Sequence, residues 1–336
     1  MQATQHAGQV TEVLSDSYGR RFQYLRLSIT DICNFKCSYC LPNGYQCHGA
    51  PKSNLNLAEI KNLLQVFSSL GTEKIRLTGG EPSVRKDLTK IIEIAASTPG
   101  INQVAMTTNG YKLKENIQSW ADAGLKAINV SMDSLEAKSF ELITGHHRLK
   151  SILEGVELAL SLGLKVKANA VLLKGINDQQ LPLFLNWVKH KNVAWRFIEL
   201  MQTGDNHEYF SKHHLSGRTV VDWLSNDGWE ACKRSKNAGP AIEYTHPDYL
   251  GKIGIIAPYS KDFCTNCNRL RVDTEGHLHL CLFASNGYSL RHLLQQESQQ
   301  QELKTYLNTL LQGKEATHYL HQGYSGSTYN LSMLGG

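Results

Sequence analysis

The chain has 336 residues, of which 41% are hydrophobic and 19% are charged. This composition is typical of a globular protein and excludes collagen-like and intrinsically disordered classes. Thirty-five Lys and Arg residues against 30 Asp and Glu residues give a net charge of +5. That excess is too small to indicate a nucleic-acid partner by itself, although it is compatible with an anionic small molecule.

Signals for export and membrane insertion are missing from the sequence pattern. No apolar run approaches the ~20 residues of a membrane-spanning helix, and residues 1–10 lack the basic flank and apolar stretch of an export signal. We therefore expect a cytoplasmic protein with no membrane partner. In that compartment the eight cysteines should stay reduced, so metals are their expected partners.

Strand and helix patterns alternate after residues 1–14, which we expect to form a flexible leader. Residues 24–30 alternate apolar and polar side chains, which predicts a strand. Residues 57–70 have helical apolar spacing, with Asn56 and Glu59 as a start signal and Gly71 as a stop signal. Further strands are predicted near residues 74–78, 102–107, 126–132, 165–173 and 193–199.

Six strands alternating with helices predict an α/β fold whose parallel sheet curls into a full or partial (β/α)6 barrel of the TIM-like type over residues 15–215. In such folds the chemistry lies on the loops at the carboxyl ends of the strands. The alternation of strands and helices stops beyond about residue 215, so residues 216–336 are expected to form a C-terminal extension. Within it, residues 289–312 predict a helix, and the Gln-rich run at 295–301 is expected to be solvated. The apolar face of this helix is Leu290, Leu294, Leu303, Leu307 and Leu310.

A first cysteine triplet, C-x3-C-x2-C, follows the first predicted strand and consists of Cys33, Cys37 and Cys40. Three closely spaced thiolates can bind three irons of a [4Fe–4S] cubane and leave the fourth iron open. A zinc site completed by Cys47 or His48 is equally compatible with this spacing, as are three unrelated thiols.

Two motifs together resemble a known superfamily. Residues 33–40, CNFKCSYC, resemble the cluster loop of the radical S-adenosylmethionine superfamily, and Gly79-Gly80-Glu81-Pro82 resembles its methionine-binding motif. The resemblance implies that S-adenosylmethionine chelates the open iron and is split to a 5′-deoxyadenosyl radical. Physically, the glycines permit close backbone approach and Glu81 can accept a hydrogen bond. A tight strand-to-helix connection would use the same glycines.

A second triplet, C-x2-C-x13-C, consists of Cys264, Cys267 and Cys281. By spacing alone, a structural zinc site with His277 or His279 as the fourth ligand is at least as compatible as an iron–sulfur cluster.

The segment around this triplet resembles one family in particular. Residues 263–271, FCTNCNRLR, together with Gly276, residues 281–283 and the terminal Gly335-Gly336, resemble the GTP 3′,8-cyclase family of molybdenum cofactor biosynthesis. The resemblance runs from about residue 13 to the end. It implies a second [4Fe–4S] cluster, bound by the second triplet, whose free iron faces the guanine of GTP. If the Gly-Gly tail reaches into the cavity, it should support turnover more than folding.

The family resemblance also implies a reaction and a set of site residues. The radical removes hydrogen from C3′ of GTP, and the C3′ radical attacks C8 to give 3′,8-cyclo-7,8-dihydroguanosine triphosphate. Leu41 and Gln202 stand where Phe and Pro are expected, which leaves the shape of the cofactor pocket open. The expected GTP contacts are Arg26, Arg76, Thr108, Lys167, Arg269, Leu270 and Arg271; the expected S-adenosylmethionine contacts are Tyr39, Gly79, Gly80, Glu81, Ser131 and Met201; the expected catalytic arginines are Arg196, Arg269 and Arg271.

The distribution of cationic residues independently favours a triphosphate substrate. Several Lys and Arg residues fall on predicted strands or strand ends, where they could face one cavity and bind phosphate. Any single one could instead form a surface ion pair. The set is Arg26, Arg76, Lys167, Arg196, Arg269 and Arg271.

The resemblance further implies an electron donor such as flavodoxin or ferredoxin, and a hand-off of product to cyclic pyranopterin monophosphate synthase. The chain could be a monomer or a homodimer.

One alternative function is that of a radical S-adenosylmethionine enzyme that modifies a peptide, although such enzymes often carry more C-terminal cysteines. Others are an iron–sulfur electron carrier and a zinc-stabilised binding module, both of which leave the Gly-Gly-Glu-Pro motif unexplained. Cys47 and Cys232 are expected to be free thiols, and the histidine doublets at 146–147 and 213–214 to be solvated.

Overall fold

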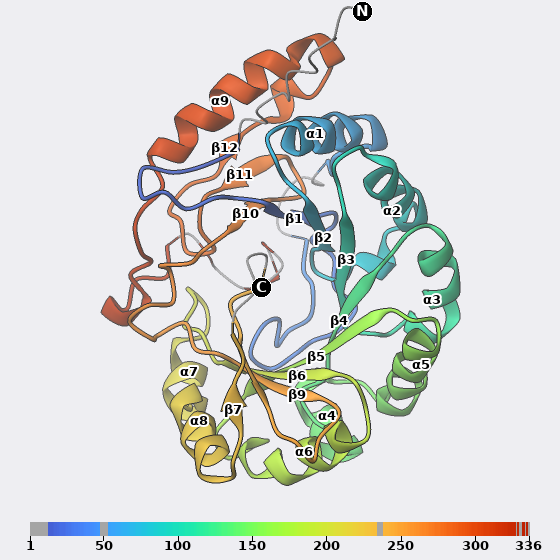
Figure 1. Cartoon of the computed structure of the whole chain (residues 1–336), viewed down its shortest axis with the longest axis vertical. Coiled ribbons are helices and arrows are strands. Elements are labelled where there is room, and N and C mark those ends of the chain that lie inside the picture. The colour runs from blue at the N-terminus through green and yellow to red at the C-terminus, as the bar shows by residue number, and fades with distance from the viewer. Residues whose placement is uncertain are drawn as a thin grey trace, which may run out of the picture.

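The computed structural model describes residues 13–47, 53–233, 238–326, 328, 331, 332 and 334. One sheet curves around a central space, and helices cover its outer side (Figure 1). None of the described helices combines the length and apolar character needed to cross a bilayer. The strands are β1 (Tyr24–Ser28), β2 (Lys74–Thr78), β3 (Gln103–Thr108), β4 (Ala127–Ser131), β5 (Lys165–Leu172), β6 (Ala194–Glu199), β7 (Glu230–Ala231), β8 (Ile242–Thr245), β9 (Lys252–Ile256), β10 (Arg269–Val272), β11 (His277–His279) and β12 (Tyr288–Ser289). The helices are α1 (Leu57–Ser69), α2 (Leu88–Ser97), α3 (Leu113–Asp122), α4 (Ala137–Thr144), α5 (Leu149–Ser161), α6 (Leu181–Lys189), α7 (His207–His213), α8 (Gly217–Asn226) and α9 (Gln300–Gln312).

The strand order is β12-β11-β10-β1-β2-β3-β4-β5-β6-β9-β8-β7. The strands from β10 through β1–β6 to β9 run parallel, which confirms the predicted partial barrel. The C-terminal region extends this barrel at both ends, because β10 pairs with β1 and β9 pairs with β6. Among the described residues no pairing joins β12 to β7, so the barrel remains open.

Alternation along each parallel strand separates a hydrophobic layer from a polar interior. Leu25 and Leu27 of β1 are fully buried in the core between the sheet and the helices, whereas Arg26 between them lines the central cavity. Successive side chains of a strand point to opposite faces, so one strand serves both layers. Strand β6 repeats the arrangement, with Trp195 and Phe197 in the core and Arg196 in the cavity.

The predicted start of helix α1 is confirmed in detail. The Asn56 side chain accepts a hydrogen bond from the Glu59 backbone N–H at 2.9 Å, and the Glu59 carboxylate accepts one from the Asn56 N–H at 2.8 Å. This capping box satisfies two N–H groups that the helix itself cannot pair. Glu59 also accepts a hydrogen bond from Arg291 Nε at 2.8 Å, which ties α1 to the C-terminal region.

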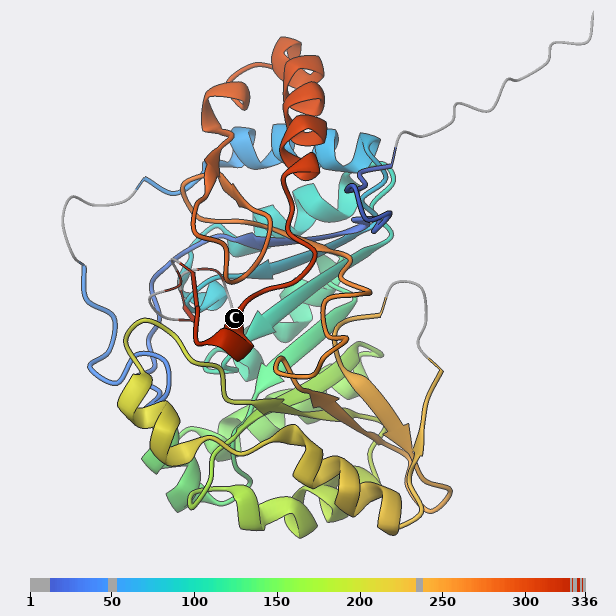
Figure 2. The ribbon, with the colours of Figure 1, turned by 90° about the vertical axis from the view of Figure 1, so that its left-hand side faces the viewer.

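The helix predicted over residues 289–312 is wrong in its first half. Helix α9 begins at Gln300, and the buried Leu290 and Leu294 flank a short 3₁₀ turn at Arg291–Leu293. A second 3₁₀ turn at Glu297–Gln299 precedes α9. Gln296 and Gln299 form a capping box that breaks the run before α9. Helix α9 lies beside α1 (Figure 2) and buries Leu311 rather than Leu310. The Gln-rich run is largely exposed, as expected.

The N-terminal segment is folded from an earlier point than its sequence predicts. Residues 1–12 of the expected leader lie outside the described residues, but Leu14 is fully buried and its carbonyl pairs with the Phe22 N–H. Arg20 then donates hydrogen bonds to the carbonyls of Glu315 at 2.6 Å and Ala316 at 2.7 Å. The segment before β1 is therefore tied to the stretch that follows α9. The predicted domain boundary at residues 215 and 216 falls between α7 and α8, within a region whose strands share one sheet.

Truncation of Leu307 should destabilise the protein. This α9 side chain is fully buried, so Leu307→Ala should lower the free energy of unfolding by about 2–5 kcal/mol. Urea denaturation followed by circular dichroism measures the loss. As a control, Leu142 of α4 is 71% exposed, and Leu142→Ala should change stability by less than about 0.5 kcal/mol. Equal losses in both variants would contradict the packing described for α9.

Candidate functional site

The loop that carries Cys33, Cys37 and Cys40 is anchored to helix α4. Within the loop, the Cys40 backbone N–H donates to the Cys37 carbonyl at 2.9 Å, which closes a turn. The Ser38 N–H donates to the Ile143 carbonyl at 2.9 Å. These backbone bonds fix the thiols at the carboxyl end of β1, which is where parallel α/β folds place their chemistry.

His146 also holds this loop, contrary to the expectation that both histidine doublets are solvated. Its ring stacks on Phe35 with a centroid separation of 4.4 Å, and its Nε2 lies 2.8 Å from the Asn34 carbonyl oxygen. In the second doublet, His214 Nε2 lies 2.8 Å from a Glu199 carboxylate oxygen. One histidine of each doublet is thus structural, which spacing along the chain cannot reveal.

The donor set of the first triplet fits an iron–sulfur cluster. Burial raises the pKa of Cys33 to about 11 and that of Cys40 to about 12, and it raises the pKa of Cys37 well above its usual value. Repulsion from neighbouring thiolates adds to the shifts of Cys37 and Cys40, so the three sulfurs lie close together and, once ionised, need a cationic partner. Among the described residues no three His, Cys, Asp or Glu side chains converge as one metal ion would require. In a cubane each thiolate binds a different iron.

Gly79 and Gly80 let the β2 loop pass against the backbone of the cluster loop. A Cβ on Gly79, whose φ is +148°, would lie 2.1 Å from the Thr30 carbonyl oxygen, and one on Gly80 would lie 2.4 Å from that of Ile32. The Gly80 N–H donates to the Thr30 carbonyl at 2.8 Å. The sequence motif predicts that these glycines let the backbone approach a ligand closely. In the structure, part of this close approach is made to the protein's own backbone at Thr30 and Ile32.

Glu81 is buried and its carboxylate is engaged by the next loop. It accepts hydrogen bonds from Thr108 Oγ1 at 2.7 Å, the Asn109 N–H at 2.6 Å and the Ser83 N–H at 3.0 Å. Burial raises the pKa of Glu81, and these hydrogen bonds oppose that shift. Glu81 thus links the loops after β2 and β3, beside the position expected for the cofactor.

The expected cofactor contacts lie near the carboxyl ends of the strands. Tyr39 donates a hydrogen bond to Asp133 at 2.9 Å, and Ser131 ends β4. Met201 lines the central cavity, whereas Tyr39, Gly79, Gly80, Glu81 and Ser131 lie outside its described lining.

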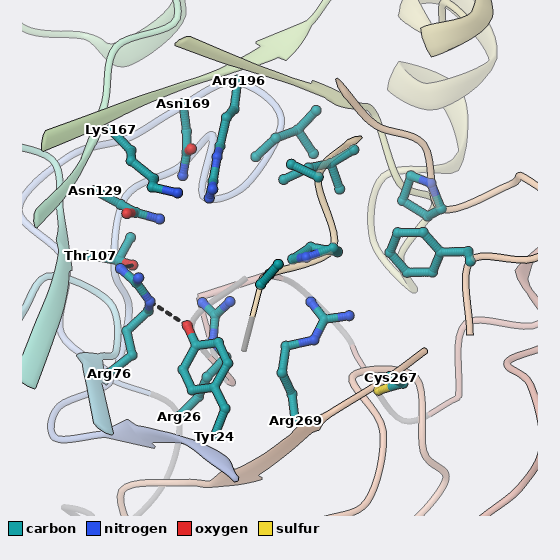
Figure 3. A pocket seen from close by; sticks show the side chains of 18 of the residues that line it. Tyr24, Arg26, Arg76, Thr107, Asn129, Lys167, Asn169, Arg196, Cys267 and Arg269 are labelled. Carbon is teal, nitrogen blue, oxygen red and sulfur yellow. Dashed lines mark hydrogen bonds between the residues drawn. The ribbon is translucent and has the colours of Figure 1, made fainter. Parts of the chain in front are cut away.

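The barrel encloses a cavity of about 510 Å3. All six cationic residues predicted to converge line this one cavity. Their positions follow from strand register, because Arg26 is aligned with Arg76 on one side and with Arg271 on the other. Figure 3 shows Arg26, Arg76, Lys167 and Arg196 pointing into the same space. The basic lining residues are Arg26, Lys74, Arg76, Lys165, Lys167, Arg196, Lys233, Lys252, Arg269 and Arg271, and Glu243 is the acidic one.

Two GTP contacts implied by the resemblance face away from this space. Thr107, not Thr108, lines the cavity, while the Thr108 hydroxyl donates to Glu81. Leu270 is buried in the hydrophobic core between the cavity-lining Arg269 and Arg271. Strand alternation explains both positions, because neighbouring residues point to opposite faces.

The same alternation could have found several residues that sequence reasoning missed. Tyr24, Lys74, Lys165 and Asn169 each lie two residues from a predicted cationic residue on the same strand, and all four line the cavity. Lys252 and Glu243 carried no such signal, since β8 and β9 were not predicted.

Tyr24 lies within a cluster of cations. Arg76 Nε donates a hydrogen bond to its phenol oxygen (Figure 3), and Lys74 Nζ lies 4.7 Å from its ring centroid. Burial alone would raise the pKa of Tyr24, but the charges of Arg76, Arg26 and Lys74 outweigh it and lower that pKa to about 7. Burial lowers the pKa of Lys74 to about 8 and that of Arg26 to about 9, as expected for crowded cations.

The second cysteine triplet lies in the wall of this cavity. Cys264, Cys267 and Cys281 all line it, and the Cys267 N–H donates to the Cys264 carbonyl at 3.1 Å. Burial would raise the pKa of Cys267, but Arg269 and Lys314 outweigh it and lower that pKa to about 6. A thiol that ionises this readily suits metal ligation, so the donor set fits a cluster.

Neither histidine of the alternative zinc site is directed to a thiol. His279 Nε2 lies 2.9 Å from an Asp273 carboxylate oxygen, and His277 Nδ1 lies 3.1 Å from the same atom. Both imidazoles therefore support the β10–β11 turn.

Comparison with known proteins identifies the family to which this chain belongs. A Radical SAM superfamily model matches residues 27–188, and a Molybdenum Cofactor Synthesis C model matches residues 193–320. A GTP 3′,8-cyclase from Shewanella denitrificans (strain OS217) is 56% identical over 324 residues, which cover 96% of each chain. Another, from Aeromonas hydrophila subsp. hydrophila, is 52% identical over 328 residues with the same coverage. The chain belongs to the GTP 3′,8-cyclase family. Its radical SAM membership implies a [4Fe–4S] cluster and S-adenosylmethionine.

A solved structure shows the fold in a more distant protein. Streptococcus suis SuiB bound to S-adenosylmethionine superposes with a TM-score of 0.61 at 14% identity, covering 87% of this chain and 67% of that one. At this identity the likeness concerns the barrel alone.

Ionisation of Tyr24 should be visible at near-neutral pH. In the GTP-free protein, raising the pH through about 7 should convert this phenol to a phenolate, because Arg76, Arg26 and Lys74 stabilise the anion. Near-ultraviolet absorbance, recorded from about pH 6 to pH 8, should therefore rise in the wild type and stay flat in Tyr24→Phe. A wild-type curve that is flat below about pH 9 would contradict this assignment.

Proposed function

We propose that this chain converts GTP to (8S)-3′,8-cyclo-7,8-dihydroguanosine 5′-triphosphate, the first step of molybdenum cofactor biosynthesis. The observation that carries the proposal is the cavity wall, where ten Lys and Arg residues and the three cysteines of the second triplet face one space of about 510 Å3. A triphosphate supplies several anionic oxygens in one molecule, and guanidinium groups bind them through charge-assisted hydrogen bonds. Membership in the cyclase family agrees with this choice of substrate.

Cys33, Cys37 and Cys40 would hold the first cluster, with Tyr39, Gly79, Gly80, Glu81, Ser131 and Met201 around S-adenosylmethionine. When bound and reduced by one electron, this cofactor pair supplies the 5′-deoxyadenosyl radical that removes hydrogen from C3′ of GTP. The barrel contributes containment, because its hydrophobic outer layer and covering helices separate the reacting atoms from water.

Cys264, Cys267 and Cys281 would hold a second [4Fe–4S] cluster whose open iron faces the guanine. Arg26, Arg76, Thr108, Lys167, Arg269, Leu270 and Arg271 would bind GTP, with Thr108 and Leu270 acting through their backbone or neighbours, since their side chains point elsewhere. Holding the base and ribose in register matters because a displacement of ~1 Å can lower the rate about a hundredfold.

Arg196, Arg269 and Arg271 would serve as the catalytic arginines once the base is bound. Nε of Arg196 and Nε of Arg271 are buried and have no hydrogen-bond partner within the described part of the chain. A buried donor without a partner is costly, and an anionic or carbonyl ligand in the cavity would satisfy it. These arginines would also stabilise charge as the cyclised product accepts one electron and one proton.

The proposed reaction needs an electron donor and an acceptor for its product. A flavodoxin or ferredoxin would supply electrons, and cyclic pyranopterin monophosphate synthase would receive the product. Gly335 and Gly336, which should support turnover if the tail reaches into the cavity, lie outside the described residues.

An anaerobic assay tests the proposed reaction. Protein incubated with reductant, S-adenosylmethionine and GTP should yield 5′-deoxyadenosine and a cyclised nucleotide, both identified by mass spectrometry. Omission of GTP should leave little 5′-deoxyadenosine. Deoxyadenosine that forms only with a peptide would instead support the peptide-modifying alternative, and none with any substrate would support an electron carrier.

Cysteine variants separate the two proposed clusters. Wild-type protein purified without oxygen should contain about eight irons per chain, as two four-iron clusters require. Cys37→Ala should abolish cofactor cleavage, whereas Cys267→Ala should lower iron to about four and impair nucleotide conversion. The matched control is Cys47→Ala, which removes an exposed cysteine outside both triplets and should change neither readout. About four irons in the wild type would overturn the second cluster.

A further inference from the structure

Glu243 is the one acidic residue in the described wall of a cavity that ten Lys and Arg residues surround. Lys167 Nζ and Arg196 Nη2 both contact the same carboxylate oxygen, at 3.0 Å and 2.5 Å. Figure 3 shows both basic side chains directed into the central space, next to Asn129 and Asn169. The carboxylate therefore occupies the position of an anion within a cationic site.

The sheet register is built for this contact. Arg196 on β6 is aligned with Gly254 on β9, and Gly254 is aligned with Glu243 on β8. The two charged residues thus lie two strands apart, with a glycine between them. A Cβ on Gly254 would lie 2.9 Å from Arg196 Cγ and 3.6 Å from Glu243 Cγ. Without a side chain at that position, Arg196 and Glu243 can meet across β9.

Electrostatics explain why a carboxylate is tolerated in this wall. Burial lowers the pKa of Lys167 and of Arg196, and repulsion from neighbouring cations lowers both further. Burial alone would raise the pKa of Glu243, but Arg196 and Lys167 outweigh it and lower that pKa to about 2. In the substrate-free cavity Glu243 thus offsets part of the cationic repulsion.

We propose that Glu243 is a positioning residue that holds Lys167 and Arg196 in the substrate-free cavity and is displaced from them by the phosphate groups of the substrate. This inference rests on the proposed function. Phosphate oxygens are strong acceptors for both cations, so phosphate and carboxylate compete for the same donors. Glu243 then lowers the affinity for polyphosphate and keeps the cavity ready to receive it.

The surroundings of Glu243 permit the exchange. Its strand lies near the end of the sheet, where β7 covers it with two residues. The Glu243 side chain is 23% exposed and the adjacent Ile242 is 54% exposed. Once released by its partners, the carboxylate can therefore turn toward water without crossing the core.

Calorimetric titration with inorganic tripolyphosphate tests the competition without relying on turnover. We use the anaerobically purified full chain and compare wild type with Glu243→Gln, which removes the charge and keeps the shape. The dissociation constant for tripolyphosphate should fall about 3- to 10-fold in the variant, because a carboxylate no longer competes. Glu230→Gln, a matched change on the exposed strand β7 of the same hairpin, should bind like wild type.

Kinetics provide the second readout. The KM for GTP should fall in Glu243→Gln by about the same factor as the dissociation constant for tripolyphosphate, since ground-state phosphate binding changes. Unchanged or weaker tripolyphosphate binding, no detectable binding to wild type, or a fall in kcat with KM unchanged would each overturn the proposal. If Glu243→Gln fails to fold, Glu243→Ala replaces it with the same expected directions. Failure of the proposed cyclisation is distinguishable, because GTP would then give no cyclised product while tripolyphosphate affinity still changed.

Discussion

Concentration of positive charge inside a hydrophobic shell is the constraint on which the rest of this structure depends. The strands place Arg and Lys at alternate positions, and their intervening residues form a continuous apolar core with the helices. Burying so many cations is unfavourable unless anions accompany them, since each loses hydration and repels the others. The interior therefore requires negative charge. Among the described lining residues, Glu243 supplies one carboxylate, which offsets only part of the positive charge.

The two cysteine triplets stand in contrasting surroundings. The first lies on a loop at the carboxyl end of β1, where burial, followed by nearby carboxylates and neighbouring thiols, disfavours ionisation. The second lies in the cavity wall beside Arg269 and Lys314, which favour ionisation of Cys267. Ionisation is thus disfavoured by the surroundings of Cys37 and Cys40 in the first set, whereas neighbouring cations favour ionisation of Cys267 in the second.

Much of the barrel could be predicted from sequence because its strands and helices have strong periods. The limits of β2 match the predicted range, and α1 has the predicted cap at Asn56. Strands β8, β9 and β10 were missed because no helices alternate with them, and β9 and β10 obtain their parallel partners from distant parts of the chain. The same cause hid Glu243. Convergence of the six predicted cationic residues was correct, whereas Thr108 and Leu270 show that a family motif does not specify which way each side chain points.

The arrangement of β10 also bears on how the protein is made. Strand β1 pairs with β2 nearby in the chain, but its other neighbour is β10, more than 240 residues later by the numbering of their first residues. During translation, that edge of β1 has no partner until residues 269–272 leave the ribosome, and unpaired strand edges promote association between nascent chains. The charged face of β1 limits this hazard, because Arg26 disfavours stacking against another apolar strand.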